Sequence, residues 1–284
     1  MQDSGKTELL IEAAKEEMDL KDRRLNHTFV VCAYGESPYL EECIESLEDQ
    51  SVGSHIIIST STPNDYIKGI AEKHDLKVYV NEGESGITQD WNFGLSRVNT
   101  KYATLAHQDD VYDGDYLRYV YVSLKKAKNP IIAFSDYYEL RNGEKSADST
   151  MLKIKRLMSL PLRLKFVRRS IILRRRLLGF GNLICCPSVT YVMDRIEQPL
   201  FENHFRSNED WEAWEKLSKQ TGDFVYVPAK LMSHRVHEGS TTFEMIQDDK
   251  RSSEDYEMFR KFWPGCIAKL LCRVYKKSEK YNGV

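Results

Sequence analysis

Short apolar runs alternate with amphipathic stretches through the first part of the chain. The runs Phe29–Ala33, Ile56–Ser59 and Val78–Val80 are continuous but brief, which is typical of strands buried on both faces of a sheet. Between them, residues 40–47 and 65–71 carry apolar side chains at helical spacing. This β-α-β-α-β order predicts a parallel sheet with crossover helices, and such sheets bind ligands at the carboxyl ends of their strands.

The same two patterns continue to the end of the chain. Helical spacing marks residues 8–24, where we expect a peripheral helix, and it returns in 87–98, in 113–128 and in the tail from Ser252. A further helix is expected to begin at Glu209-Asp210-Trp211. The remaining expected elements are strands at Tyr102–Ala106, Ile131–Phe134 and Phe224–Val227, and a turn at Arg141–Glu144.

Length and composition fit one large α/β domain with a small helical addition. The 284 residues are 41% hydrophobic and 30% charged, and the formal net charge of −2 gives no general attraction to nucleic acid. No apolar run approaches the roughly 18 residues that span a bilayer. The mixed charges of residues 1–24 do not fit a secretory signal. We expect a cytoplasmic protein, soluble or peripheral on the inner face of the cell membrane.

The six cysteines do not indicate chemistry of their own. None belongs to a CxxC pair, which disfavours a zinc site. Cys32 falls inside a predicted strand and Cys43 on the apolar stripe of a predicted helix. Both are therefore expected to be small core residues of a protein in a reducing compartment.

The most distinctive local feature is His107-Gln108-Asp109-Asp110, at the end of a predicted buried strand. Two adjacent carboxylates are costly in a dry site. A divalent cation such as Mn²⁺ or Mg²⁺ would relieve the repulsion, because both prefer oxygen ligands and commonly bridge phosphates. Alternatively, Asp110 caps the following helix while Asp109 points to water. The tetrapeptide alone leaves both interpretations open.

Two further groups of polar residues could carry chemistry. Glu209-Asp210 stands at the predicted start of a helix, where paired acids are common because they interact favourably with the helix dipole. His234 and His237 follow a predicted strand, and a surface pair of this kind is usually incidental. Taken singly, each group is better explained without catalysis.

Taken in order, these groups resemble the motifs of the family 2 glycosyltransferases, which are inverting enzymes with the GT-A fold. The resemblance extends over about residues 26–245. The opening strand with Ala33-Tyr34-Gly35-Glu36-Ser37-Pro38-Tyr39-Leu40 resembles the family's first strand and nucleotide loop. Further along, Asn81–Gly86 with Trp91–Leu95 resembles its glycine and Asn-containing helix, His107–Asp110 its Asp-x-Asp-Asp motif, Glu209-Asp210 its Glu-Asp pair, and Arg235–Thr242 its Arg-x-His-x-x-Ser element.

The resemblance implies a fold and a division of the chain. The fold is α/β, a GT-A (Rossmann-like) mixed and mostly parallel sheet flanked by helices, with a helical C-terminal extension. The expected divisions are a peripheral N-terminal helix in 1–25, a catalytic domain in 26–245 and the extension in 246–284. The catalytic domain would comprise a nucleotide-binding half at about 26–135 and an acceptor half at about 136–245, with a basic insertion at 151–180.

The resemblance also implies an inverting, metal-dependent sugar transfer. The donor would be a nucleoside-diphosphate sugar, a UDP-sugar before others, and the acceptor a saccharide or lipid-linked hydroxyl in cell-surface polysaccharide or glycolipid synthesis. A divalent cation, Mn²⁺ or Mg²⁺, held by Asp109 and His237 would stabilise the departing diphosphate, and Asp210 would act as the general base. The expected nucleotide contacts are Ala33, Tyr34, Glu36, Thr60, Ser61, Gly86, Asn92, His107, Gln108 and Asp109.

Two positions depart from the family pattern. Thr60-Ser61-Thr62-Pro63 stands where the family often has Asp-Asp-Gly-Ser, so the acidic contact to a uracil is missing. His107 stands in place of the first Asp of the metal motif, which leaves one negative charge fewer. A neutral histidine could still bond a ribose hydroxyl or ligate the metal.

One stretch of the chain is strongly basic. No acidic residue occurs from Met151 to Met193, and ten Lys or Arg lie between Lys153 and Arg176 among apolar residues. This stretch is either a solvated helix face or a surface for anionic lipid. Nucleic acid is a poorer partner, because no binding motif accompanies the charge. The residues expected at lipid are Arg174, Arg175 and Arg176, with Trp263, Ile267, Leu270, Leu271, Lys276 and Lys277 of the tail.

Two other functions stay open. A nucleotidyltransferase can use a similar sheet and metal carboxylates, but Tyr34-Gly35-Glu36-Ser37 lacks the glycine-rich, basic phosphate loop that such enzymes normally have. A catalytically degenerate GT-A module that binds a sugar nucleotide or a membrane would account for His107 and the lost Asp pair. The presence of Asp210 and His237 argues against it.

Overall fold

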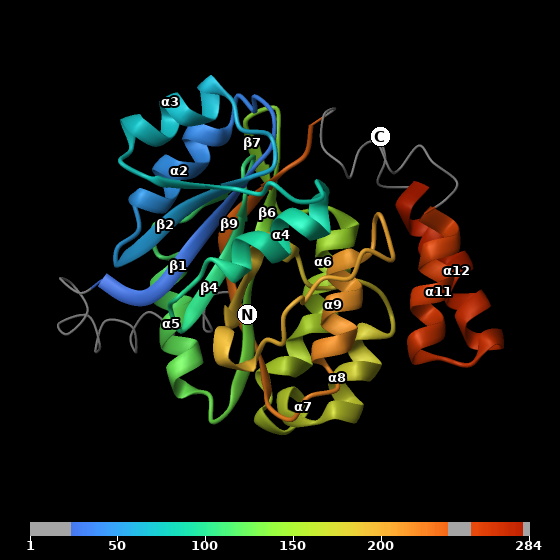
Figure 1. The fold of residues 1–284 in the computed structure, drawn as a ribbon. Helices are drawn as coiled ribbons and strands as arrows, with labels where there is room; N and C mark the ends of the chain where they lie inside the picture. Colours follow the sequence, from blue (N-terminus) through green and yellow to red (C-terminus); the bar gives the residue numbers. More distant parts are fainter. Residues whose placement is uncertain (1–23, 238–250, 281–284) are drawn as a thin grey trace.

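The computed structural model describes residues 24–237 and 251–280 (Figure 1). The strands are β1 (Arg24–Ala33), β2 (Gly53–Thr60), β3 (Lys77–Val80), β4 (Tyr102–His107), β5 (Val111–Tyr112), β6 (Pro130–Arg141), β7 (Glu144–Ser146), β8 (Val189–Val192) and β9 (Asp223–Arg235). The α-helices are α2 (Leu40–Glu48), α3 (Asp65–Lys73), α4 (Ile87–Ser96), α5 (Tyr116–Lys126), α6 (Thr150–Ser159), α7 (Lys165–Arg169), α8 (Ile171–Leu178), α9 (Glu209–Leu217), α11 (Arg251–Phe262) and α12 (Gly265–Lys280). Short 3₁₀ turns occur at η1 (Leu160–Arg163), η2 (Cys186–Ser188) and η3 (Met193–Arg195).

Within the described residues, the strands form one mixed sheet. Their order is β3-β2-β1-β4-β8-β6-β9-β5, with β7 paired to β6. The strands β3, β2, β1 and β4 run parallel to one another. Strand β8 is antiparallel to both β4 and β6, and β9 runs parallel to β6. This arrangement confirms the expected mixed, mostly parallel α/β sheet. Strands from both expected halves of the chain share it, because β4 pairs with β8.

Helices cover both faces of the sheet because its central strands are apolar on both. In β1, Phe29 and Val31 pack with α2, α3 and α5, whereas Val30 belongs to a second cluster with α4, α8 and α9. Helix α4 lies very close to the sheet at Gly94. A Cβ on Gly94 would stand 2.7 Å from a methyl carbon of Val30, so only glycine permits this approach.

The helical tail packs on the rest of the protein through α9. Figure 1 shows α11 and α12 side by side at one edge of the molecule. Trp211 of α9 and Phe205 form a buried cluster with Met258, Phe259 and Ala268 of the tail. The expected tail helices are therefore present, and they support the helix that begins with Glu209-Asp210.

Some predicted elements differ from the structure in extent. The strand expected at Phe224–Val227 continues to Arg235, so His234 lies within β9 instead of after it. The short strand β8 was not predicted, because four residues between turns give little periodic signal. The expected N-terminal helix and the last residues of the Arg-x-His element, 238–242, lie outside the described residues, as do the side chains of Lys276 and Lys277.

Candidate active site

A cavity of about 1030 Å³ lies at the carboxyl ends of β1 and β4. From β1 the chain crosses to β2 on one side, and it later returns to β4 on the other, so this is the point where the strand order reverses and where such sheets bind ligands. The cavity is lined by most of the expected site residues, namely Ala33, Tyr34, Glu36, Gly86, His107, Gln108, Asp109, Asp210 and His237.

Three expected nucleotide contacts, Thr60, Ser61 and Asn92, do not line the cavity. Thr60 is fully buried, and its hydroxyl accepts a hydrogen bond from the backbone N–H of Thr62 at 3.0 Å. The Asn92 amide donates to the carbonyl of Phe201 at 2.7 Å and accepts from the backbone N–H of Leu200 at 2.9 Å. We therefore reassign Asn92 from a nucleotide contact to a support that ties α4 to the loop before α9.

The loop after β1 is anchored by the side chain of Gln108, which belongs to the His107–Asp110 motif. The Gln108 amide accepts from the backbone N–H of Tyr34 at 2.9 Å and donates to its carbonyl at 3.1 Å. Gly35, at φ +61°, donates to the Thr62 hydroxyl at 2.7 Å. These bonds leave the Tyr34 ring 60% exposed at the cavity, where a planar base could stack on it.

An acidic residue that no sequence motif indicated, Asp90, also lines the cavity. The carboxylate of Asp90, in α4, accepts from the Ser61 hydroxyl at 2.6 Å and from the Asn81 amide at 2.8 Å. Asp90 is 8% exposed and lines the cavity. It thus supplies a negative charge beside Ser61, close to where the acidic residue of the family pattern is missing. The sequence shows Asp90 only as an acidic residue within a segment of helical spacing, 87–98.

Asp109 and His237 come together although they are far apart in sequence. His237 Nε2 lies 3.1 Å from Asp109 Oδ2, and both side chains are partly exposed to the cavity. The close approach arises because β5, just after Asp110, pairs with β9. The guanidinium of Arg235 donates to the Asp109 carbonyl at 2.8 Å and fixes the two segments together.

The second carboxylate of the motif does not cap a helix, because α5 begins only at Tyr116. Asp110 is fully buried, and its Oδ1 accepts from His234 Nδ1 at 3.0 Å and from the backbone N–H of Arg235 at 2.9 Å. Burial opposes the charge on His234, but the Asp110 carboxylate outweighs it and raises the pKa of His234 to about 9. His234 is therefore charged at neutral pH and offsets the charge of Asp110.

His107 is a neutral imidazole whose Nε2 has no hydrogen-bond partner among the described residues. Its ring stacks on Trp91 with 5.1 Å between centroids, and burial lowers its pKa to about 4. His107 Nε2 and Asp110 Oδ2 are buried, and neither bonds to any described residue. Ligand atoms of His107, Asp109 and Asp110 lie within 4.8 Å of one another. Two buried, unsatisfied atoms beside a carboxylate fit a hard divalent cation.

Asp210 lies in the cavity at the N-terminus of α9. The Asn182 amide donates to both of its carboxylate oxygens, each at 2.9 Å, and the backbone N–H of Trp211 donates to Oδ1 at 2.7 Å. These donors and the helix terminus favour the charged carboxylate. Asn182 follows α8 in a loop without any motif, so no sequence signal pointed to it.

The neighbouring acid, Glu209, has the opposite charge state. Its side chain is 7% exposed, and burial, with a contribution from the charge of Asp210, raises the pKa of Glu209 to about 8. Glu209 is therefore mainly protonated at neutral pH. Of the two adjacent carboxyl groups, one stays neutral and the other, Asp210, carries the negative charge into the cavity.

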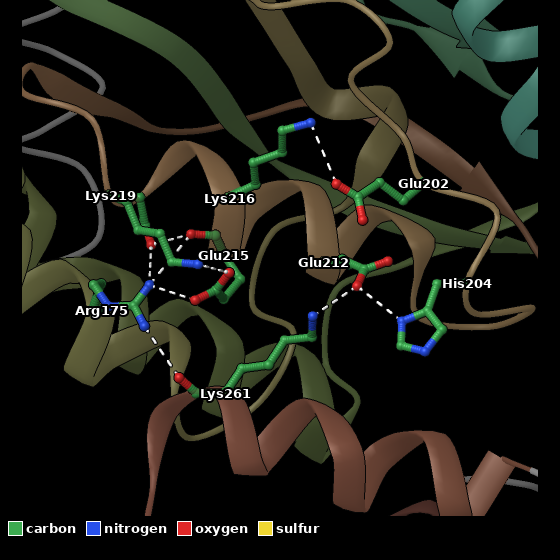
Figure 2. Close-up of polar contacts among 9 residues, drawn as sticks. Arg175, Glu202, His204, Glu212, Glu215, Lys216, Lys219 and Lys261 are labelled. Atoms are coloured by element: carbon green, nitrogen blue, oxygen red, sulfur yellow. Dashed lines mark hydrogen bonds and ion pairs between the residues drawn. The ribbon is translucent and has the colours of Figure 1, made fainter.

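Ion pairs fix the helix that carries Asp210 (Figure 2). Glu215 pairs with Arg175 of α8 at 2.7 Å and with Lys219 at 2.8 Å. Glu212 pairs with Lys261 of α11 at 2.8 Å and contacts His204 at 3.2 Å. Because Glu212 and Glu215 are almost fully buried, these pairs neutralise charges that would otherwise destabilise the fold. The helical tail thus helps to position α9.

Of the arginines expected to meet lipid, Arg174 is buried and Arg175 half-buried, whereas Arg176 is exposed. Arg174 is fully buried and donates to the backbone carbonyls of residues 218, 220 and 222. Arg175 pairs with Glu215, and the Arg176 guanidinium lies over the Trp263 ring at 4.5 Å. The expectation is wrong for Arg174, because the loop after α9 presents carbonyls that need a buried donor. No described helix is long and apolar enough to cross a membrane.

Comparison with known proteins agrees with this geometry. Residues 28–196 match the family model for glycosyl transferase family 2. A curated relative, Glycosyltransferase GlyA of Streptococcus pneumoniae, is 25% identical over 122 residues, which are 41% of this chain and 17% of the relative. The chain therefore spans about a sixth of the length of that relative.

Two solved structures share the fold. Staphylococcus aureus TarS, solved with UDP-GlcNAc, superimposes with a TM-score of 0.60 and 15% identity, covering 87% of this chain and 70% of that one. A mannosyltransferase from Pyrobaculum calidifontis, solved with GDP-Man and Mn²⁺, gives a TM-score of 0.61 and 13% identity, covering 98% and 82%. The expected GT-A fold is confirmed.

Proposed function

We propose that this chain, which belongs to glycosyl transferase family 2, is a glycosyltransferase that transfers a sugar from a nucleoside-diphosphate sugar to an acceptor hydroxyl with inversion at the anomeric carbon. One observation carries the proposal. A single cavity brings together a cluster suited to a divalent cation, at Asp109, and a charged, firmly held carboxylate, Asp210. These are the two groups that a metal-assisted, inverting transfer needs.

The donor is a UDP-sugar or, as second choice, a GDP-sugar. The exposed Tyr34 ring offers a stacking surface for the base, and the Asp90 carboxylate lines the same cavity. Uracil and guanine each carry a ring N–H that can donate to a carboxylate, whereas cytosine does not. The similar structures from S. aureus and P. calidifontis hold a UDP-sugar and a GDP-sugar.

The residues that would hold a cation at the diphosphate differ in exposure and charge. Asp109 and His237 present the exposed ligands, and the neutral His107 with Asp110 lies behind them. A bound Mn²⁺ or Mg²⁺ would neutralise charge on the departing nucleoside diphosphate. Because His234 already offsets Asp110, Asp109 is the principal negative charge available to the cation.

Asp210 is the general base of the proposed reaction. It accepts the proton of the acceptor hydroxyl while that oxygen attacks the anomeric carbon and the bond to the diphosphate breaks. Asn182 and the backbone N–H of Trp211 keep its carboxylate charged and oriented. Glu209, protonated at neutral pH, adds no second negative charge that would repel the donor.

A surface near α7 supports attachment to anionic membrane, as expected for cell-surface polysaccharide or glycolipid synthesis. Leu164 and Phe166 are 51% and 65% exposed, and the exposed Arg163 and Lys165 alternate with them. Apolar side chains between cationic ones can enter the headgroup region of an anionic bilayer. This surface replaces Arg174 and Arg175 as the proposed lipid contact, while the exposed Arg176 stays a proposed contact.

Calorimetric titration of UDP, GDP, CDP and dTDP, each with and without Mn²⁺, tests the proposal. We expect UDP or GDP to bind clearly more tightly with Mn²⁺ than without it, and CDP to bind weakly. If a folded sample binds none of the four nucleotides, the cavity is not a donor site and the proposal fails.

A further inference from the structure

A second cavity, of about 140 Å³, lies between α6 and α12. Its walls are almost entirely apolar, and we call it the α6–α12 groove. It is formed by Met151, Ile154 and Met158 of α6, by Leu183, and by Leu271 and Val274 of α12. An apolar cavity of this kind attracts hydrocarbon and offers little to a sugar or a nucleotide.

The α6–α12 groove is continuous with the candidate active site. Met151, Lys155, Asn182 and Tyr275 line both cavities. Asn182 is also the residue whose amide donates to both carboxylate oxygens of Asp210. A molecule that extends from the groove past Asn182 therefore reaches the proposed general base directly.

The positively charged side chain of Lys155 lies where the two cavities meet. The ammonium of Lys155 donates to the Tyr137 hydroxyl at 3.2 Å and lies 5.8 Å from the centroid of that ring. No carboxylate of the described residues forms an ion pair with Lys155. An ammonium group without a carboxylate partner, beside an apolar wall, favours an anionic group of the ligand.

We propose that the groove binds the aliphatic chain of a lipid-linked acceptor, that Lys155 binds the phosphate joining chain to sugar, and that the attacked hydroxyl lies at Asp210. This inference rests on the proposed function. Along the two joined cavities, the apolar groove is followed by the Lys155 ammonium and then by the proposed general base, Asp210. This order matches the order of aliphatic chain, phosphate and hydroxyl along such a molecule. A free saccharide would leave the groove and Lys155 unused.

Alkyl phosphates below their micellar concentration are suitable probes, because monomers separate groove binding from adsorption to a membrane. We would titrate inorganic phosphate and butyl, hexyl and octyl phosphate by calorimetry, with UDP and Mn²⁺ present. Each methylene that the groove buries should tighten binding about fourfold. Inorganic phosphate should bind too weakly to detect, and octyl glucoside more weakly than octyl phosphate.

Matched variants locate the binding. Ile154→Gln and Val274→Gln alter exposed residues of the groove and should each weaken octyl phosphate about tenfold, since they remove a large apolar contact. Leu157→Gln is the control, because Leu157 is on the same helix and 68% exposed but outside the groove. Lys155→Gln should weaken octyl phosphate about tenfold and leave octyl glucoside unchanged, whereas Lys153→Gln should change neither.

Four results would overturn the inference. Affinity that is independent of chain length would show that the groove takes no hydrocarbon. An equal loss in Leu157→Gln would indicate general adsorption, and equal binding of octyl phosphate and octyl glucoside would remove the role of Lys155. Nucleotide binding is measured on every sample, so intact UDP binding without alkyl phosphate binding refutes only this inference. Loss of nucleotide binding in the unaltered protein refutes the proposed function itself.

Discussion

The protonation of Glu209 can be tested by replacing it with glutamine, which keeps its shape and removes its titration. The pKa of this buried carboxyl is raised to about 8, against roughly 4.3 in an unfolded chain. Between these two values the folded protein binds more protons than the unfolded chain. The stability of the unaltered protein must therefore fall as pH rises through this window, and the Glu209→Gln variant lacks that contribution.

The magnitude follows from the width of the window. One pKa unit corresponds to about 1.4 kcal/mol, so the free energy of unfolding should fall by up to about that amount per pH unit. From about pH 5 to about pH 7, the unaltered protein should lose roughly 2.5 kcal/mol relative to Glu209→Gln. Because both proteins contain every other titrating group, the difference between their pH profiles isolates Glu209.

Urea unfolding followed by tryptophan fluorescence supplies the measurement. Trp211 is fully buried and follows the Glu209-Asp210 pair directly, so its emission should report unfolding of this region. A difference in unfolding free energy that stays constant with pH would show that Glu209 is ionised in the folded protein. Asp210 would then not be the only charged member of the pair, and the division of roles between them would be wrong.

Three further predictions test other parts of the account. Asp109→Asn should weaken Mn²⁺-dependent UDP binding at least about tenfold, since it removes the main anionic ligand; calorimetry showing undiminished binding would move the cation elsewhere. Asp90→Asn should weaken UDP about tenfold and leave CDP unchanged, because it replaces the charged acceptor for the base N–H by a neutral amide oxygen that accepts more weakly; an equal loss for both would contradict base recognition. Arg174→Met should destabilise the fold by about 3–5 kcal/mol in urea unfolding, because buried carbonyls lose their donor, whereas Arg176→Gln should cost under about 1 kcal/mol; equal effects would mean that Arg174 is not a structural residue.

Local patterns predicted most of the sheet because its central strands are covered on both faces. Residues of β1 and β4 must be apolar almost without interruption, and such runs are visible in a sequence. The pairing of Asp109 with His237 was also anticipated, although only the resemblance to a family linked the two positions. Their contact depends on β5 pairing with β9, which no local pattern reveals.

The orientation of polar side chains could not be predicted in the same way. The run Arg174–Arg176 shows positive charge in the sequence, but burial of Arg174 depends on a loop some forty residues later that presents three carbonyls to it. Asn182 has no motif around it, and its importance comes only from lying against Asp210. Such contacts are set by packing between distant segments, so composition and spacing do not encode them visibly.

The central claim is that this cavity transfers sugar with Asp210 as the general base, and Asp210→Asn tests it most directly. The measurement is donor binding together with release of UDP as the bound UDP-sugar is hydrolysed, with water in place of the acceptor hydroxyl, in the presence of Mn²⁺ and with the exposed Asp194→Asn as control. We predict unchanged donor affinity in Asp210→Asn and a turnover lower by about a hundredfold to ten-thousandfold. Turnover equal to that of the control would contradict the account.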